Sequence, residues 1–311
     1  MASPSLQPTS ARPADSPAKG GPPSPSGSKL GLLAELAKAR LTLLVVITTF
    51  VGFLLASRPP LDWWLLLHSV IGTALLASGA SALNQWLERR LDALMERTQD
   101  RPLPSGRMQP RTALILGLTG SLAGLVQLLV AVNGMTALLG VLTLAAYVVI
   151  YTPLKTITPF NTIVGAIPGA MPPLMGWVAA RGEINAAGWT LFAVQFFWQL
   201  PHFLAIAWLY RDDYARAGFR MLPIVDPDGR QTGFHAVSHT LGLLTVSLAP
   251  VALGMAGVAY LLAAVLLGAG FLILAIRFAR RLDRLAARAL FLASIIYLPA
   301  LLAVMVWDKA R

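Results

Sequence analysis

The stretch Asn84-Gln-Trp-Leu-Glu88-Arg-Arg-Leu-Asp92-Ala-Leu-Met-Glu-Arg97-Thr-Gln-Asp-Arg101-Pro102 concentrates acidic and basic residues more densely than any other part of the sequence. It follows a long apolar run that begins near Leu61, which predicts the last turns of a membrane-spanning helix and a charged loop after it. Asn84, Glu88 and Asp92 are spaced i, i+4, i+8 and therefore share one helix face. Two carboxylates and an amide beside arginines suit a magnesium ion that holds a diphosphate.

These charges have a simpler interpretation, in which a solvated helix end pairs its own acidic and basic side chains. In a soluble protein we would favour that interpretation. At the end of an apolar membrane segment, however, ionisable residues are costly and usually functional. The position of the stretch therefore favours a binding or catalytic site.

The composition places the chain in the membrane class. Of its 311 residues, 56% are hydrophobic and only 13% are charged, whereas a soluble domain carries about 25% charged residues. We therefore expect an all-α polytopic membrane protein. There is no cysteine, which excludes disulfides, thiolate metal sites and cysteine nucleophiles. The net charge of +11 is explained by arginines in cytoplasmic loops, so no nucleic-acid partner is expected.

The composition divides the chain into two regions. Residues 1–29 are rich in proline and serine and contain no apolar core, so we predict a disordered cytoplasmic tail, with residues 30–311 forming one intramembrane domain. Residues 234–276 lack Asp, Glu, Lys and Arg and are long enough for two spans with a turn near residues 254–257. Together the apolar runs predict nine transmembrane helices, at about residues 30–57, 61–90, 112–132, 135–151, 161–180, 188–210, two within 234–276, and 288–307.

The distribution of basic residues gives an independent test of this topology. With the tail on the cytoplasmic side, 21 of the 25 lysines and arginines fall inside, and the exceptions are Arg58, Arg181, Lys309 and Arg311. Such a bias is difficult to obtain from a wrong topology. We therefore expect a multi-pass protein of the cell (inner) membrane, with the N-terminus and the charged loops cytoplasmic and the C-terminus outside.

Three further positions carry polar chemistry. Asp212 and Asp213 end an apolar helix on the side of Glu88, so they face the motif across a cavity or form a solvated helix end. His202 lies eight residues before Tyr210, about 12 Å inside the membrane edge, where an imidazole must find a partner or line a polar cavity. Lys155 is isolated on the motif side, where it suits a phosphate or simply follows the positive-inside rule.

The pattern formed by Asn84, Glu88 and Asp92 resembles the Asn-x-x-x-Asp-x-x-x-Asp motif of the UbiA-type intramembrane prenyltransferase superfamily, with glutamate in the middle position. A closer resemblance, over about residues 30 to 305, is to the haem O synthase (protohaem IX farnesyltransferase) branch. It rests on five ordered blocks, Met95-Glu-Arg97-Thr-Gln-Asp-Arg101-Pro102, Tyr151-Thr-Pro-Leu-Lys155, Asn161 to Trp177, Trp198-Gln-Leu-Pro-His202-Phe and Asp213-Tyr-Ala-Arg-Ala-Gly-Phe-Arg-Met-Leu-Pro223.

The resemblance implies a bundle of helices around a central cavity and transfer of a farnesyl group from farnesyl diphosphate to haem B. It implies Mg²⁺ as the cofactor, the lipid bilayer as the medium, and a haem A synthase or a terminal oxidase in assembly as partner proteins. The roles it implies are catalysis (Asn84, Glu88, Asp92, His202, Asp213), metal binding (Asn84, Glu88, Asp92, Asp212, Asp213), diphosphate binding (Arg97, Arg101, Lys155) and contact with haem or another acceptor (Tyr151, His202, Tyr210).

The chain departs from the superfamily pattern at the second acidic motif, Asp-x-x-x-Asp. Here the two positions are Leu209 and Asp213, so one carboxylate is missing and Asp212 is the available substitute. Two alternatives remain. One is a prenyltransferase that acts on a quinone precursor or a chlorophyll-type acceptor. The other is a transporter, which also needs buried polar residues but places them at the membrane midplane.

Overall fold

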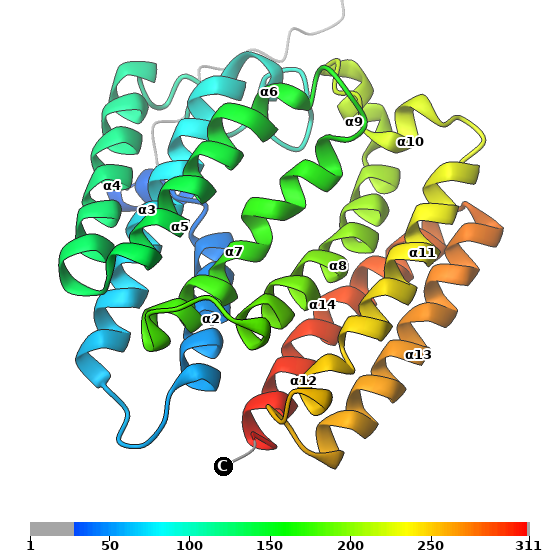
Figure 1. Ribbon diagram of the computed structural model, residues 1–311. Coiled ribbons are helices and arrows are strands. Elements are labelled where there is room, and N and C mark those ends of the chain that lie inside the picture. The colour runs from blue at the N-terminus through cyan, green and yellow to red at the C-terminus, as the bar shows by residue number, and fades with distance from the viewer. Residues whose placement is uncertain (1–27, 310–311) are drawn as a thin grey trace, which may run out of the picture.

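The computed structural model describes residues 28–309, and this part of the chain is almost entirely helical (Figure 1). Nine of its helical segments are long and apolar enough to cross a membrane, which confirms the predicted number. The expected tail lies outside the described residues except for Ser28 and Lys29, which cap and begin the first helix. The elements are α1 (Lys29–Leu36), α2 (Ala39–Ala56), α3 (Trp63–Asp92), α4 (Pro110–Ala131), α5 (Gly134–Leu144), η1 (Ala145–Tyr151), α6 (Thr152–Leu154), α7 (Asn161–Arg181), α8 (Ala186–Leu209), α9 (Arg211–Arg216), α10 (Leu222–Val225), α11 (Arg230–Val246), α12 (Ala249–Ala252), α13 (Val258–Arg281) and α14 (Arg284–Trp307).

Two predicted helices differ from the structure. The segment 30–57 was predicted as one helix, but α1 ends at Leu36 and α2 begins at Ala39, with Lys38 in a left-handed conformation at φ 48°. The span predicted near residues 135–151 ends in a π-helix, η1, which is a rare geometry that occurs mostly at functional sites. The uncharged region 234–276 does contain two spanning segments, joined by a turn before α13 begins at Val258.

Close helix packing positions the acidic face of α3. A β-carbon added to Gly79 would lie 2.4 Å from the backbone nitrogen of Ser121 in α4, and one added to Gly176 of α7 would lie 1.9 Å from the carbonyl oxygen of Thr49 in α2. Only glycine allows the backbones to approach this closely. The α3–α4 and α2–α7 pairs are therefore held at fixed separations.

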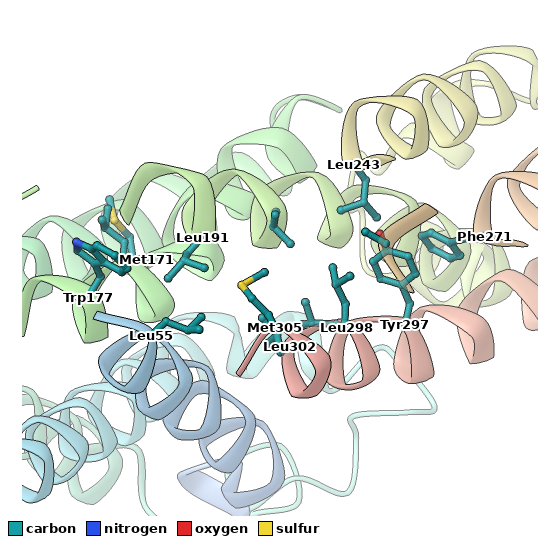
Figure 2. Close-up of a cluster of buried hydrophobic side chains, with 14 of the residues drawn as sticks. Leu55, Met171, Trp177, Leu191, Leu243, Phe271, Tyr297, Leu298, Leu302 and Met305 are labelled. Carbon is teal, nitrogen blue, oxygen red and sulfur yellow. The ribbon is translucent and has the colours of Figure 1, made fainter. Parts of the chain in front are cut away.

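The largest apolar core lies away from the acidic stretch. Figure 2 shows buried side chains from α2, α7, α8, α11, α13 and α14 meeting in this core, among them Leu55, Trp177, Leu243, Phe271 and Met305. This packing supports α8, which carries His202 and contacts α7, α11 and α14.

The two ends of the bundle differ in composition. In Figure 1 the short elements α6, α9 and α10 gather at the upper end, and the described C-terminus lies at the lower end. Of the four basic residues that the charge distribution assigned to the outer side, Arg181 and Lys309 lie close enough to interact electrostatically. The Nζ atom of Lys309 donates to the carbonyl oxygens of Leu54 and Ser57, and burial followed by the positive charge of Arg181 lowers the pKa of Lys309.

Candidate active site

A cavity of about 440 Å³ opens among α2, α3, η1, α7 and α8. Its lining on α3 runs from Thr73 to Asp92, which corresponds to about 28 Å at 1.5 Å per residue. One end is polar and is lined by Lys38, Glu88, Asp92, Arg101 and Lys155; most of the remaining wall is apolar. The cavity therefore suits a ligand with an anionic head and a long apolar body.

The three motif residues on α3 are buried, with exposed fractions of 0%, 4% and 1% for Asn84, Glu88 and Asp92. Each of the three contacts one cation from another segment. The pairs are Lys38 Nζ with Asn84 Oδ1 (2.8 Å), Lys155 Nζ with Glu88 Oε1 (2.7 Å), and Arg101 Nη1 with Asp92 Oδ1 and Oδ2 (2.9 and 2.8 Å). The helical spacing predicted the common face, and the structure confirms that this face is turned inward.

The amide of Asn84 has a fixed orientation. Thr152 donates its hydroxyl hydrogen to the carbonyl oxygen of Tyr147 (2.8 Å), so its oxygen accepts from Nδ2 of Asn84 (3.2 Å). The Asn84 Oδ1 atom is thereby directed toward Lys38. An oxygen fixed in this way is a suitable metal ligand, because no reorientation is needed on binding.

The polar end of the cavity carries three basic and two acidic side chains. Burial, followed by the charges of Arg101 and Lys155, lowers the pKa of Lys38 to about 7. Burial alone would also lower the pKa of Lys155, but Tyr151 and Glu88 outweigh it and raise that pKa above its ordinary value. The Lys155 ammonium is therefore firmly charged, and the site as a whole attracts an anion.

Tyr151 forms the wall beside Lys155. The Lys155 Nζ atom lies 4.7 Å from the centre of the Tyr151 ring, a cation–π contact, and both residues line the cavity. A β-carbon on Gly165 would lie 2.4 Å from Tyr151 Cε2, so the ring rests directly on the α7 backbone. The π-helix and this glycine together set the position of the ring.

The segment after α8 closes the polar end. The backbone nitrogen of Arg220 donates to the Lys155 carbonyl oxygen (2.7 Å), and Asn161 Nδ2 donates to the Arg220 carbonyl oxygen (3.0 Å). Asp213 is buried, and its carboxylate pairs with Arg216 and accepts a hydrogen bond from the Glu96 backbone nitrogen. These contacts join the segment after α8, which covers the polar end, to the loop after α3. Asp213 is not among the residues that line the cavity.

The other predicted positions near this cover lie at its rim or outside it. The Asp212 side chain is 89% exposed and reaches only Arg211, at 3.8 Å. The structure therefore does not bring this carboxylate to the cavity. Arg97 lines the mouth, where Nη2 donates to the Tyr214 hydroxyl (3.0 Å) and the guanidinium lies 5.2 Å from the Tyr210 ring. Tyr210 is exposed and supports Arg97 from outside.

His202 lines the cavity from α8 and contacts Ser294 of α14. The single hydroxyl hydrogen of Ser294 is donated to the carbonyl oxygen of Phe291 (2.5 Å). With that hydrogen directed at Phe291, the contact of 2.7 Å between Ser294 Oγ and His202 Nδ1 favours the tautomer that carries its hydrogen on Nδ1. In the neutral ring Nε2 then carries a free lone pair, which can ligate a metal or accept a proton.

The residues present fit a magnesium ion. Among residues 28–309 no three His, Cys, Asp or Glu side chains gather as a metal cluster. Mg²⁺, however, usually takes one or two carboxylates together with substrate phosphates, and α3 offers two carboxylates and an amide oxygen. Glu88 Oε1 is buried and contacts Lys155 Nζ at 2.7 Å, and a carboxylate oxygen carries two lone pairs. That oxygen retains a lone pair for a cation.

Sequence reasoning did not identify Lys38, Thr152 or Ser294 as parts of the site. Lys38 and Arg40 precede an apolar run, and the positive-inside rule was sufficient to explain both. Its contact with Asn84 arises from the break between α1 and α2, which no glycine or proline marks. Ser294 lies in an apolar helix 92 residues from His202 and carried no signal at all.

Comparisons with known proteins identify the family of the chain. Residues 45–298 match the model of the UbiA prenyltransferase family. A protoheme IX farnesyltransferase from Solibacter usitatus is 46% identical over 284 residues, covering 88% of this chain and 97% of the relative. A protoheme IX farnesyltransferase from Opitutus terrae is 44% identical over 285 residues, covering 91% and 96%.

Solved structures show the same fold at low identity. A digeranylgeranylglyceryl phosphate synthase has a TM-score of 0.77 at 18% identity, with 90% of this chain and 98% of that chain covered. A UbiA homologue from Archaeoglobus fulgidus bound to GPP and Mg²⁺ has a TM-score of 0.65 at 17% identity, with 88% and 99% covered. The family model covers most of the chain, and the relatives named above are 44–46% identical over nearly their whole length. The chain belongs to the UbiA prenyltransferase family.

Proposed function

We propose that this protein transfers the farnesyl group of farnesyl diphosphate to the 2-vinyl group of haem B, with addition of water, to give haem O and diphosphate. The names of the relatives that are 41–46% identical over most of the chain support farnesyl transfer to haem. The observation that carries the chemistry is the set of three buried α3 residues, each facing one cation, at the polar end of a membrane cavity.

The polar end would bind and activate the diphosphate. Asn84, Glu88 and Asp92 would hold Mg²⁺, which supplies electrostatic stabilisation of the departing diphosphate. Arg101 and Lys155 would turn from their carboxylates to phosphate oxygens and stabilise the same charge. Breaking the bond between the farnesyl carbon and the diphosphate oxygen leaves an allylic cation, and the apolar wall keeps bulk water away from it.

The acceptor would then complete the reaction. The vinyl group of haem B attacks the farnesyl cation, a carbon–carbon bond forms, and the new cation next to the porphyrin ring is captured by water. One proton leaves this water. His202 would contact the haem or accept that proton through Nε2, the nitrogen left free by the bond to Ser294. Tyr151 would contact the acceptor beside the diphosphate, and Arg97 would bind the diphosphate from the mouth of the cavity, where the Tyr210 ring supports it.

We also propose an orientation in the membrane. The chain is a multi-pass membrane protein, and the basic loops favour a cytoplasmic position for the polar end of the cavity, with the C-terminus outside and the cell (inner) membrane as the location. A water-soluble diphosphate would then enter from the cytoplasm. The apolar product would pass within the bilayer, to a haem A synthase or a terminal oxidase in assembly.

The test is mass analysis of haems extracted from host membranes that contain either the native protein or the Asp92→Asn variant at equal abundance, supplied with farnesyl diphosphate. We expect a haem heavier than haem B by one farnesyl group plus water, formed only with the native protein and only with Mg²⁺ present. Unchanged haem B with folded, inserted native protein would refute haem as the acceptor. A quinone-type aromatic acceptor would then be tested with the same membranes.

A further inference from the structure

The break between α1 and α2 holds a lysine in a costly conformation. Lys38 has φ 48° and is one of two residues other than glycine with positive φ in the part of the chain that the structure describes. A left-handed conformation at a residue with a β-carbon is unfavourable and persists only where surrounding contacts enforce it; such residues cluster at functional sites. Other residues must therefore hold the backbone of Lys38 in this conformation, and the conformation determines where the Lys38 side chain lies.

Gln85 enforces the break. This side chain is fully buried, and its Nε2 donates to the carbonyl oxygens of Leu36 (2.6 Å) and Glu35 (3.2 Å) at the end of α1. Gln85 directly follows Asn84 in α3, so adjacent residues hold the break and receive the lysine that emerges from it. The connection between α1 and α2 is thus held by hydrogen bonds to α3, the helix that carries Asn84.

The Lys38 ammonium lies in the cavity without a carboxylate partner. Its Nζ atom donates to Asn84 Oδ1 (2.8 Å), and it forms no ion pair with any Asp or Glu of residues 28–309. Lys155 and Arg101 balance the charges of the two motif carboxylates, Glu88 and Asp92. Among Lys38, Arg101 and Lys155, only Lys38 therefore has no carboxylate partner.

We infer that Lys38 is a diphosphate-binding residue that occupies the metal-ligand oxygen of Asn84 until the substrate arrives and then moves to the phosphate oxygens. This inference rests on the proposed function. One Mg²⁺ and one fully ionised diphosphate monoester carry together one net negative charge, which the unbalanced ammonium neutralises. The lysine thus competes with the metal for Asn84 Oδ1 and cooperates with it in holding the diphosphate.

These two roles predict opposite effects when the ammonium is removed. In Lys38→Met the metal no longer competes for Asn84, so half-saturation should need about threefold less Mg²⁺. The diphosphate loses one charge-assisted hydrogen bond, so its affinity should fall about tenfold to a hundredfold. A residue that only supports the fold would weaken metal and diphosphate binding together.

The experiment uses the full-length protein purified in detergent and a slowly reacting substrate analogue, farnesyl thiolodiphosphate. Calorimetry gives the analogue's Kd at saturating Mg²⁺ and, in a second series without the analogue, the Mg²⁺ concentration that half-saturates the metal site. Lys38→Met is compared with Lys38→Arg, which should recover most of the affinity. The matched control is Arg40→Met, an exposed cation of the same segment that should change neither quantity.

A further variant separates binding from folding. Lys38→Gly removes the ammonium and relieves the left-handed conformation, so it should unfold no more easily than the native protein while losing analogue affinity like Lys38→Met. Unchanged affinity in both variants, or weakened binding of both metal and analogue, would overturn the inference. If the native protein itself fails to bind the analogue, the proposed function fails instead.

Discussion

Replacing Lys155 with methionine should destabilise the protein strongly, because it leaves a buried carboxylate without its partner. Lys155 and Glu88 form an ion pair at 2.7 Å with side-chain exposed fractions of only 12% and 5%. Removing one partner of such a buried pair costs about 3–5 kcal/mol, most of which is the uncompensated charge that remains. We therefore expect Lys155→Met to lower the free energy of unfolding by about that amount.

The double variant Lys155→Met/Glu88→Gln removes the stranded charge together with its partner. It should recover most of the lost stability, since replacing both members of a buried pair is often nearly neutral, and yet it should be inactive because both groups serve the diphosphate site. Stability then returns without function. The contrast separates the structural contribution of the pair from its chemical role.

The assay is unfolding in mixed micelles with increasing dodecyl sulfate, followed by tryptophan fluorescence for the native protein, both single variants and the double variant. The matched control is Arg211→Met. Its pair with Asp212 is exposed, at 50% and 89%, and spans 3.8 Å, so its loss should cost about 0–1 kcal/mol. Additive effects of the two single changes, or equal losses for Lys155→Met and Arg211→Met, would refute the reasoning.

Three further changes test other parts of the cavity. Asp92→Asn should abolish turnover at every Mg²⁺ concentration without unfolding the protein; wild-type rates would remove the motif from the mechanism. Gly165→Val should press on the Tyr151 ring, which already lies 2.4 Å from an added β-carbon, and lower the farnesylation rate at least tenfold; an unchanged rate would show that the ring position is unimportant. Ser294→Ala frees the His202 tautomer and should alter the visible spectrum of bound haem, whereas Ser294→Thr should preserve it; identical spectra for all three proteins would exclude a role for the tautomer.

The sequence predicted the number of spanning helices because apolar length is a strong signal that depends little on tertiary contacts. It also predicted that Asn84, Glu88 and Asp92 share a face, since that follows from helix geometry alone. The break at Lys38 was missed because Gln85, distant in sequence, imposes it on a segment of ordinary helix formers. Local patterns do not record contacts of this kind.

The roles assigned to the acidic residues after α8 show the same limit. Asp212 and Asp213 are neighbours in sequence, and only packing decides that one is exposed and the other is buried beside Arg216. The π-helix that carries Tyr151 likewise reads as ordinary helix, because its sequence of alanine, tyrosine, valine and isoleucine has no distinguishing residue. These features depend on how the helices pack against one another, which the local sequence does not specify.

The glycine contacts between helices have a consequence for substrate choice. Because α3 and α4, and likewise α2 and α7, touch backbone to backbone, the walls of the cavity have little freedom to spread for a longer isoprenoid. The length of prenyl chain that fits is then limited by side chains such as Leu76 and Met175, which line the cavity far from the motif. A designer who wishes to change prenyl chain length would trim these residues and leave the glycines untouched.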